Sequence, residues 1–153
     1  TSSIRTFTKK LNWKALDFIF VDMPPGTGDT QLTFSQEIKI DGAIIVSTPQ
    51  EVALLDVKRG IKMFDKLGVK ILGLVDNMSY FIGDDKKKYK IFGEGGVRKT
   101  SEEFKKEFLG EIPINSEIGK TSDNGKPIVE EDSNSEISKI YINFANKIKS
   151  TYL

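Results

Sequence analysis

Short, nearly continuous apolar runs recur along this chain, separated by longer amphipathic or polar stretches. Three of them are rich in β-branched residues: Phe18 to Val21, Ala43 to Val46 and Val69 to Val75. A run without polar alternation is typical of a strand that is buried on both faces of a parallel sheet. A weaker fourth run, Phe108 to Pro113, predicts a short terminal strand that ends at the proline.

Helical periodicity fills the intervals between these runs. From Gln50 to Leu67 apolar residues recur every three or four positions, and Gly68 ends the amphipathic helix that this pattern predicts. Further helical segments are predicted elsewhere: Thr30 to Ile38 with Asp29 as its cap, Thr100 to Phe108 with Ser101 as its cap, Ser135 to Lys149, and a helix that closes at Leu11 to Trp13.

Two segments are expected to be loops. Tyr80 to Phe92 is polar and contains three consecutive lysines, Lys86 to Lys88, a charge run that usually forms a solvated face. Asn115 to Glu131 contains the turn signal DNGKP. Because strands and helices alternate with short connections, we predict an α/β fold with three layers, a mostly parallel sheet flanked by helices. The first clear element is a buried strand, so we expect this sheet to be incomplete at the N-terminus.

The stretch from Asp17 to Asp29, DFIFVDMPPGTGD, combines a buried run with a shaped loop. Asp22 ends the apolar run, which places a carboxylate at the edge of the sheet where α/β proteins bind ligands. Pro24 to Gly28 cannot continue a strand, since proline fixes some backbone dihedrals and glycine permits others. An acid followed by such a loop is the layout of a metal and phosphate sensor. An ordinary strand followed by a turn remains the alternative.

Polar or turn residues follow three further predicted strands: Ser47-Thr48-Pro49, Asp76-Asn77 and Pro113. Parallel strands bring their carboxyl ends to one edge, so these residues and Asp22 are expected to line one rim. Asn77 can donate and accept hydrogen bonds at once, which suits the edge of an adenine base. A turn-forming asparagine that closes the strand is an equally good interpretation.

The amino-acid composition limits which metal sites and catalytic groups this chain can supply. The chain of 153 residues has no Cys and no His, and its formal net charge is +1. Thiolate metal sites and histidine bases are therefore excluded from it, so any metal would bind oxygen ligands, as Mg²⁺ prefers. The balanced charge gives no electrostatic case for nucleic acid or membrane partners. No apolar run approaches a membrane span, and residues 1–10 do not resemble a signal peptide. We therefore expect a cytoplasmic protein of one domain.

The segment GEGGVRKT, Gly93 to Thr100, looks like a phosphate-binding loop of the KGGVGKT kind. A working loop needs glycine immediately before its lysine, and here Arg98 stands at that position, while Glu94 occupies the position of the signature lysine. The preceding residues are charged rather than a buried strand. We interpret the segment as a surface turn and helix start, and the chain as lacking a phosphate-binding loop.

Six ordered blocks nevertheless resemble the Mrp/ApbC-type ATPases, which are MinD/ParA-like P-loop proteins implicated in iron–sulfur cluster carriage. The blocks cover nearly everything from Asp17 to the end: VDMPPGTGD, STPQEVALLD, NMSYF, IFGEGG, LGEIP and GKPIV. The resemblance implies a P-loop NTPase-like fold, with residues 1–153 as the C-terminal part of a single nucleotide-binding domain. The phosphate-binding loop of the family lies upstream of this stretch.

The resemblance also implies roles for particular residues. Asp22 would be the catalytic acid that acts on Mg²⁺, through water. Asn77 would bind adenine, and Pro113 would wall the base. The loop from Pro24 to Gly28 would sense and hold the γ-phosphate. Gly26 would be the sensor, with Pro25, Thr27 and Gly28 beside it.

The implied cofactors are ATP, Mg²⁺ and an iron–sulfur cluster, and the implied partners are ATP, a second copy in a homodimer, and apo iron–sulfur acceptor proteins. Many members carry a Cys-x-x-Cys pair just after NMSYF. Here that loop reads IGDDKKK, without Cys ligands for a cluster. We expect the full-length protein to hydrolyse ATP and act in cluster assembly, and residues 1–153 alone to be inactive. The alternative is a nucleotide-switched scaffold or positioning protein that carries no cluster.

Overall fold

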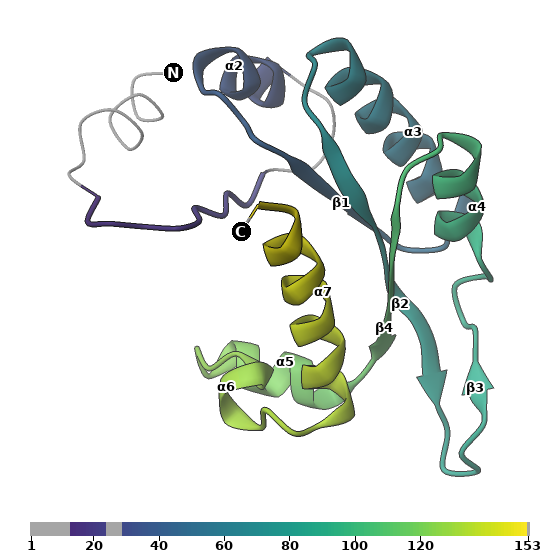
Figure 1. The fold of residues 1–153 in the computed structure, drawn as a ribbon. Helices are drawn as coiled ribbons and strands as arrows, with labels where there is room; N and C mark the ends of the chain where they lie inside the picture. Colours follow the sequence, from purple (N-terminus) through teal and green to yellow (C-terminus); the bar gives the residue numbers. More distant parts are fainter. Residues whose placement is uncertain (1–12, 24–28, 153) are drawn as a thin grey trace.

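The structure, a computed structural model, describes residues 13–23 and 29–152 (Figure 1). Residues 1–12, where we expect the end of a helix, lie outside the described part of the chain. The described helices and strands follow one another in this order: α2 (Asp29–Glu37), β1 (Ala43–Ser47), α3 (Glu51–Lys66), β2 (Ile71–Ile82), β3 (Lys88–Tyr89), α4 (Gly96–Glu103), β4 (Phe108–Ile114), α5 (Ser116–Asp123), α6 (Ile128–Glu131) and α7 (Glu136–Tyr152).

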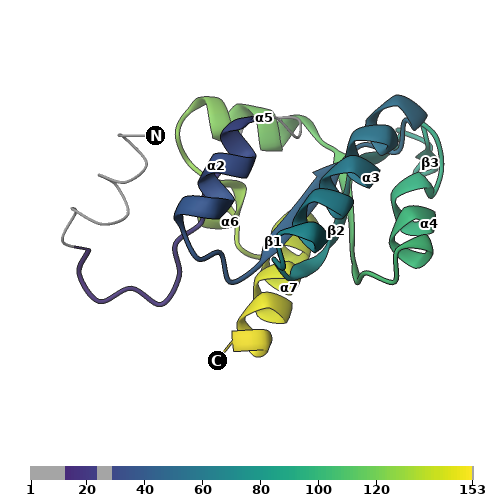
Figure 2. The ribbon, with the colours of Figure 1, turned by 90° about the horizontal axis from the view of Figure 1, so that it is seen from above.

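The sheet has β2 at its centre. β1 and β4 pair with β2 in parallel on either side, and the short β3 pairs antiparallel with the far end of β2. Helices α3 and α4 cover one face of this sheet and α7 covers the other (Figures 1 and 2). The prediction of a mostly parallel sheet flanked by helices is therefore confirmed. None of the helices in the described part of the chain combines the length and apolar content needed to cross a bilayer.

The core beneath α3 follows from the periodicity of its sequence. Three residues of its predicted apolar face are buried, and the side chain of Ile61 is completely inaccessible. They pack against β2 and α4, in a cluster of six buried residues: Leu54, Val57, Ile61, Ile71, Leu74 and Val97. Removing such a side chain from water contributes about 1.5–3 kcal/mol. The helix ends at Lys66, and Gly68 supplies the left-handed backbone, with φ of 69°, that ends it.

A second core forms between the other face of the sheet and α7. Val75 of β2 and two residues of β4, Leu109 and Ile112, are buried there. The apolar stripe predicted for the last helix supplies much of the cover, together with one residue each from α5 and β1: Ile140, Tyr141, Phe144, Ile118 and Ile44. Both faces of the sheet are therefore packed, as a parallel sheet requires.

Strand β2 is longer than predicted and includes part of the expected loop. Residues 76–82 continue the strand and form a hairpin with β3, where Phe81 faces Tyr89. The strand bends where its register with β4 shifts, between Asn77 and Phe81, and Met78 there adopts φ of 54°. Such a bulge changes the direction of the strand without ending it. The polar residues of this stretch had instead predicted a strand end.

The predicted strand at residues 18–21 is wrong. This stretch is irregular, and Ile19 and Phe20 expose 59% and 72% of their surface. A strand is stable only when a neighbour satisfies its backbone hydrogen bonds, and none of the described strands lies beside this stretch. Instead Phe18 packs edge-to-face on Tyr152 near the end of α7, with ring centroids 6.4 Å apart. The apolar composition is right for a buried strand, but its partners are not in the described structure.

Several boundaries also differ from prediction. Asp29, predicted as the cap that precedes the helix, is the first residue of α2. Strand β1 is only half-buried, and β4 continues past Pro113 to Ile114. The helix predicted from Thr100 to Phe108 is α4, which begins earlier, ends at Glu103 and has Ser101 buried inside it. The loop-rich stretch 115–131 contains two short helices, α5 and α6, joined by the predicted turn. Helix α4 starts within GEGGVRKT, so the interpretation of that segment as a turn and helix start is confirmed.

Candidate functional site

The carboxyl ends of three parallel strands meet at one edge of the sheet. Asn77 of β2 lies opposite Ile112 of β4, the residue before Pro113, and Asp76 lies opposite both Ser47 of β1 and Glu111 of β4. Pro113 is buried and Asn77 is half-buried. The structure therefore brings together Asn77 and Pro113, the two residues predicted to contact a base. Three of the four strand ends expected along this rim are present.

Asp22 does not join this rim in the described structure. It is exposed and lies on the irregular segment 13–23, at one side of the molecule (Figure 1). Pro25, Gly26, Thr27 and Gly28 lie outside the described residues. Among those described, no group of three or more acidic side chains is arranged to hold a metal ion. Asp22 is the right kind of ligand for Mg²⁺, and it needs further oxygen ligands from water, nucleotide or other parts of the chain.

Asp76 is a residue that sequence reasoning placed on the rim without giving it a role. Only 1% of its surface is exposed, and its Oδ1 atom has no hydrogen-bond partner. Burial raises its pKa to about 6, with a further rise from the neighbouring charge of Glu111 and an opposing effect from Lys90 and Arg98. Buried carboxyls with a raised pKa are typical of functional sites. The signal in the sequence was a charged residue immediately after the uncharged run from Ile71 to Val75.

Met78 adopts a backbone conformation that non-glycine residues seldom adopt. Its φ of 54° places it in the left-handed region, directly after Asn77 in the strand. The bulge is held on its far side by Ser79, whose hydroxyl donates to the backbone oxygen of Ile112 at 3.3 Å. Strain of this kind persists only where surrounding contacts impose it, and it gathers at ligand sites. Met78 also exposes 39% of its surface beside Asn77.

The hairpin that follows contains the loop IGDDKKK, residues 82–88, which has no pair of cysteines to bind a cluster. Its turn is ordered by Asp85, whose carboxylate accepts hydrogen bonds from the Lys87 amide and the Tyr89 hydroxyl. The Lys87 amide and then Tyr89 lower the pKa of Asp85. The three lysines of the predicted charge run are exposed, with Lys88 4.2 Å from the ring centroid of Tyr80. Without Cys or His, this chain offers an iron–sulfur cluster no thiolate or imidazole ligand.

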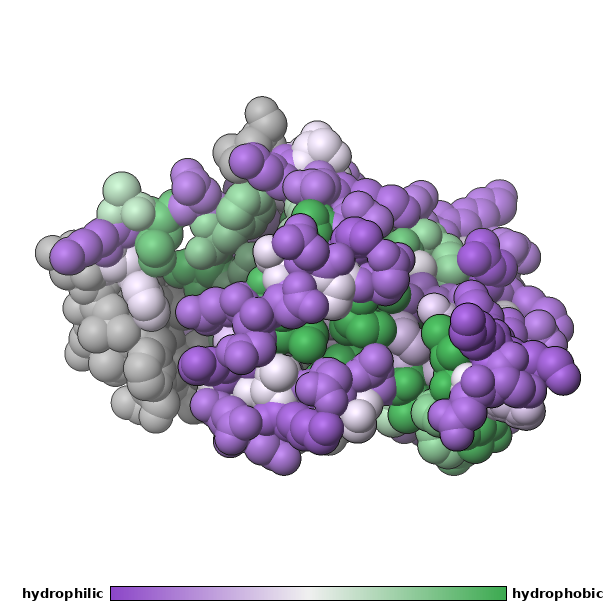
Figure 3. All heavy atoms as spheres, turned by 90° about the horizontal axis from the view of Figure 1, so that it is seen from below, coloured by the Kyte–Doolittle hydropathy of each residue, from purple (hydrophilic) through white to green (hydrophobic). Residues whose placement is uncertain are grey.

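The hairpin also exposes apolar side chains. Phe81, Ile82, Tyr89 and Ile91 each expose between 42% and 61% of their surface. Seen from below, green apolar patches lie among hydrophilic side chains across the molecule (Figure 3). Two strands with so little pairing gain little stability by themselves, so the hairpin depends on its packing against the rest of the protein or a partner.

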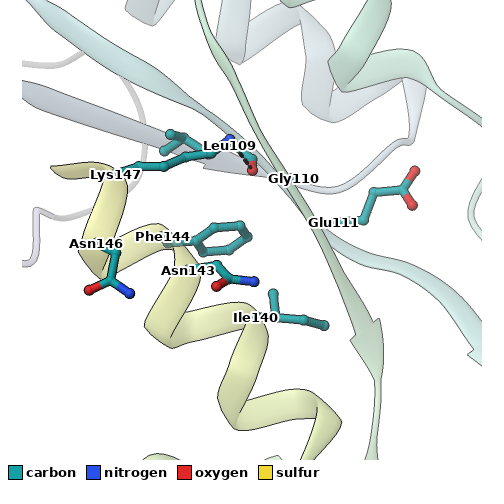
Figure 4. Close-up of a pocket in the computed structure, with 8 residues that line it drawn as sticks. All are labelled: Leu109, Gly110, Glu111, Ile140, Asn143, Phe144, Asn146 and Lys147. Atoms are coloured by element: carbon teal, nitrogen blue, oxygen red, sulfur yellow. Dashed lines mark hydrogen bonds between the residues drawn. The ribbon is translucent and has the colours of Figure 1, made fainter. Parts of the chain in front are cut away.

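A groove of about 490 Å³ lies between β4 and α7, on the face of the sheet opposite α3 (Figure 4). Its lining includes Phe144, Asn143 and Asn146 of α7. The Lys147 ammonium donates to the backbone oxygen of Leu109 at 3.3 Å and so occupies the outer edge of β4. A lysine in this place blocks the pairing of further strands. The groove runs along β4 from Leu109 to Glu111, and neither Asn77 nor Pro113 lines it.

Known proteins resemble this chain over almost its whole length. The family described as NUBPL iron-transfer P-loop NTPase, a ParA type, matches residues 1–149. The chain is 47% identical to the iron-sulfur cluster carrier protein of Synechocystis sp. over 95% of its length. It is 44% identical to the iron-sulfur cluster transfer protein NUBPL of Mus musculus over 96% of its length. The chain spans 42% and 46% of those two relatives, less than half of each.

Solved structures show the same fold. The nucleotide-binding protein from Archaeoglobus fulgidus, in complex with ADP, is 41% identical, with a TM-score of 0.74 over 82% of this chain and 52% of that chain. The cell division ATPase MinD of Pyrococcus furiosus is 22% identical, with a TM-score of 0.68 over 98% of this chain and 56% of that chain. At that identity, the likeness to MinD concerns the fold alone.

Proposed function

Because the chain belongs to the family of NUBPL iron-transfer P-loop NTPases of the ParA type, we propose that its protein binds and hydrolyses ATP and acts in iron–sulfur cluster carriage. The observation that chiefly supports this proposal is the rim at the carboxyl ends of β2 and β4. Asn77 and Pro113 lie side by side there, and a relative that is 41% identical was solved with ADP. Strand ends of this kind are where open α/β sheets bind ligands.

In this proposal the rim of the described sheet holds the base. The Asn77 amide matches the donor and acceptor edge of adenine, and buried Pro113 forms an apolar wall. The phosphates lie elsewhere, toward residues 22–28. Pro25, Thr27 and Gly28 shape the loop, and the Gly26 amide approaches the γ-phosphate because no side chain blocks it.

Asp22 is proposed to hold Mg²⁺ through water, since a hard cation prefers carboxylate and water oxygens. The ion, when bound, neutralises charge that develops on the phosphates during hydrolysis. The phosphate-binding loop is proposed to precede Thr1, because Arg98 and Glu94 disqualify the only similar segment of this chain. Residues 1–153 alone would then bind MgATP very weakly, and a protein containing the upstream loop would form homodimers.

The experiment is ATP hydrolysis by the full-length protein with and without Mg²⁺. We expect Asp22→Ala to abolish the Mg²⁺-dependent turnover. Asp17→Ala, which removes a carboxylate at the other end of the same apolar run, is the matched control and keeps it. Equal turnover by the wild type and Asp22→Ala would refute the role of Asp22. Absence of turnover in the wild type would refute hydrolysis itself.

A second function is favoured by one observation, the absence of Cys and His from this chain. A nucleotide-switched scaffold or positioning protein would bind ATP in the same way and carry no cluster. Reconstitution of the full-length protein with iron and sulfide distinguishes the two. Cluster absorbance and transfer to an apo-acceptor protein would support the carrier, with ligands from outside residues 1–153. Neither signal, with nucleotide binding intact, would establish the scaffold.

A further inference from the structure

Tyr152, the last residue of α7, is tied to the residues that lead into β1. Its hydroxyl donates to the backbone oxygen of Asp41 at 2.8 Å. Gly42 leaves room for this contact, because a Cβ atom there would lie 2.6 Å from the Tyr152 hydroxyl oxygen. Directly afterwards the Ala43 amide donates to the Lys70 carbonyl at 2.9 Å, where β1 begins beside β2. The Tyr152 ring therefore has a fixed place at the amino end of the sheet.

Phe18 packs on the same ring from the irregular segment 13–23, which passes close to the end of α7 (Figure 1). The two rings meet edge-to-face with centroids 6.4 Å apart. Phe18 is half-buried, whereas the other residues from 13 to 22 are all exposed. Phe20, whose ring centroid is 6.1 Å from that of Phe18, still exposes 72% of its surface. Phe18 is therefore the most buried side chain of residues 13–22, and it anchors them on the ring of Tyr152.

This anchor lies close to Asp22 along the chain. Asp22 follows Phe18 by four residues. Four residues span at most about 14 Å even when fully extended, so a fixed Phe18 confines the Asp22 carboxylate to a limited volume beside the sheet. An edge-to-face aromatic pair favours the anchored state over the released state by about two- to tenfold. The contact is thus strong enough to influence where Asp22 lies, and weak enough to open reversibly.

We propose that Tyr152 is a positioning residue, which holds the segment 13–23 through Phe18 and so sets the place of Asp22. The link connects the last turn of α7 with the residues that precede the loop 24–28, although the two are far apart in the sequence. When the link opens, no covalent bond is made or broken. The positioning of the segment stands without nucleotide, whereas its effect on Mg²⁺ rests on the function proposed above.

A tyrosine suits both halves of this link. Its ring supplies an apolar surface for Phe18, and its hydroxyl bonds to Asp41, so the orientation of the ring does not depend on Phe18. Tyr152 belongs to neither core and exposes 40% of its surface. Replacing it by alanine therefore leaves the packing on both faces of the sheet unchanged.

The test is limited proteolysis of the full-length protein by trypsin, without nucleotide. Lys14 is the one trypsin site in residues 13–23, and cleavage there follows the population of the released segment when opening is fast. Tyr152→Ala should accelerate cleavage at Lys14 about two- to tenfold. Cleavage at the exposed lysines of the hairpin, Lys86 to Lys88, is the internal reference and should keep its rate. Equal cleavage at Lys14 in the wild type and Tyr152→Ala would overturn the proposal.

Two further variants show whether the two rings act as one contact. Phe18→Ala should accelerate cleavage at Lys14 by the same factor as Tyr152→Ala, and the double variant should be cleaved no faster than either alone. Thr151→Ala, which removes a hydroxyl that donates to the Lys147 carbonyl within α7 at 3.0 Å, is the matched control and should be cleaved like the wild type. Effects that multiply in the double variant would refute the contact. Phe18 lies outside both cores, so Phe18→Ala decides the question if Tyr152→Ala does not fold.

The effect on Asp22 is measured separately, as ATP hydrolysis by the full-length protein at increasing Mg²⁺ concentration. Tyr152→Ala should raise the Mg²⁺ concentration that gives half-maximal turnover by about two- to tenfold. A general loss of folding would instead lower turnover alike at every concentration. Faster cleavage at Lys14 with an unchanged Mg²⁺ dependence would refute the positioning of Asp22. A wild type without turnover would refute the proposed function, and the link between Phe18 and Tyr152 would still be decided by the proteolysis.

Discussion

Replacing Asp76 by Asn removes the ionisable group from the centre of the rim and keeps its shape. In the wild type, burial raises the pKa of this carboxyl from 3.8 to about 6. Each pKa unit corresponds to 1.36 kcal/mol, so the rise costs the folded state up to about 3 kcal/mol of stability once Asp76 is ionised. Asn carries no such penalty, because it stays neutral at every pH.

The pH dependence has a definite sign. Well below pH 3.8, Asp76 is protonated in both the folded and unfolded states. Its ionisation then makes no difference between the stability of the wild type and that of Asp76→Asn. As the pH rises from about 4 to 6, the unfolded chain releases its proton while the folded chain retains it. The wild type therefore loses stability relative to Asp76→Asn across this window, and the difference levels off above about pH 6 at up to about 3 kcal/mol.

The assay is urea unfolding followed by circular dichroism at several pH values between 4.5 and 7.5, with the slope against urea compared to check that both proteins unfold alike. Asp84→Asn, which neutralises an exposed carboxylate of the hairpin, is the matched control and should remain within about 0.5 kcal/mol of the wild type. A stability difference that does not change with pH, or an Asp76→Asn variant less stable than the wild type at pH 7.5, would refute the reasoning.

Three further predictions concern packing and backbone, each measured by the same unfolding assay. Ile61→Ala should cost about 2–5 kcal/mol because Ile61 is fully buried, whereas Leu55→Ala on the exposed face of α3 should cost less than about 1 kcal/mol; equal effects would contradict the orientation of α3. Gly96→Ala should destabilise by about 1–3 kcal/mol, since its Cβ would meet Leu54 and Pro49. Met78→Gly should be neutral or stabilising by up to about 1 kcal/mol because it relieves a left-handed backbone, and a large loss would contradict the strain.

The sequence predicted those parts of the fold that local patterns decide. The apolar stripe of α3 and that of α7 each identify a buried face, because helical periodicity depends on the segment alone. The order of strands and helices along β1, β2 and β4 likewise predicted a parallel sheet. The rim formed by Asn77 and Pro113 followed from it, since parallel strands end at one edge.

The parts that were missed depend on distant partners. Residues 18–21 have the composition of a buried strand, but a strand also needs neighbours that no pattern within those residues supplies. The extension of β2 through residues 76–82 was missed because polar residues in this stretch predicted a strand end. In the structure Met78 forms a bulge there, and the strand continues. The burial of Asp76 depends on its neighbours in β1 and β4, which the order of the sequence does not reveal.

Equilibrium binding of MgATP to the full-length protein, in the wild type and in Asn77→Ala, tests the central claim most directly. If Asn77 contacts the adenine edge, the variant should bind at least about tenfold more weakly, the loss expected when a buried hydrogen-bonding partner is removed. Asn146→Ala in the groove beside α7 is the matched control and should bind like the wild type. Equal affinity of Asn77→Ala and the wild type, with both proteins folded, would contradict the assignment of this rim as the nucleotide site.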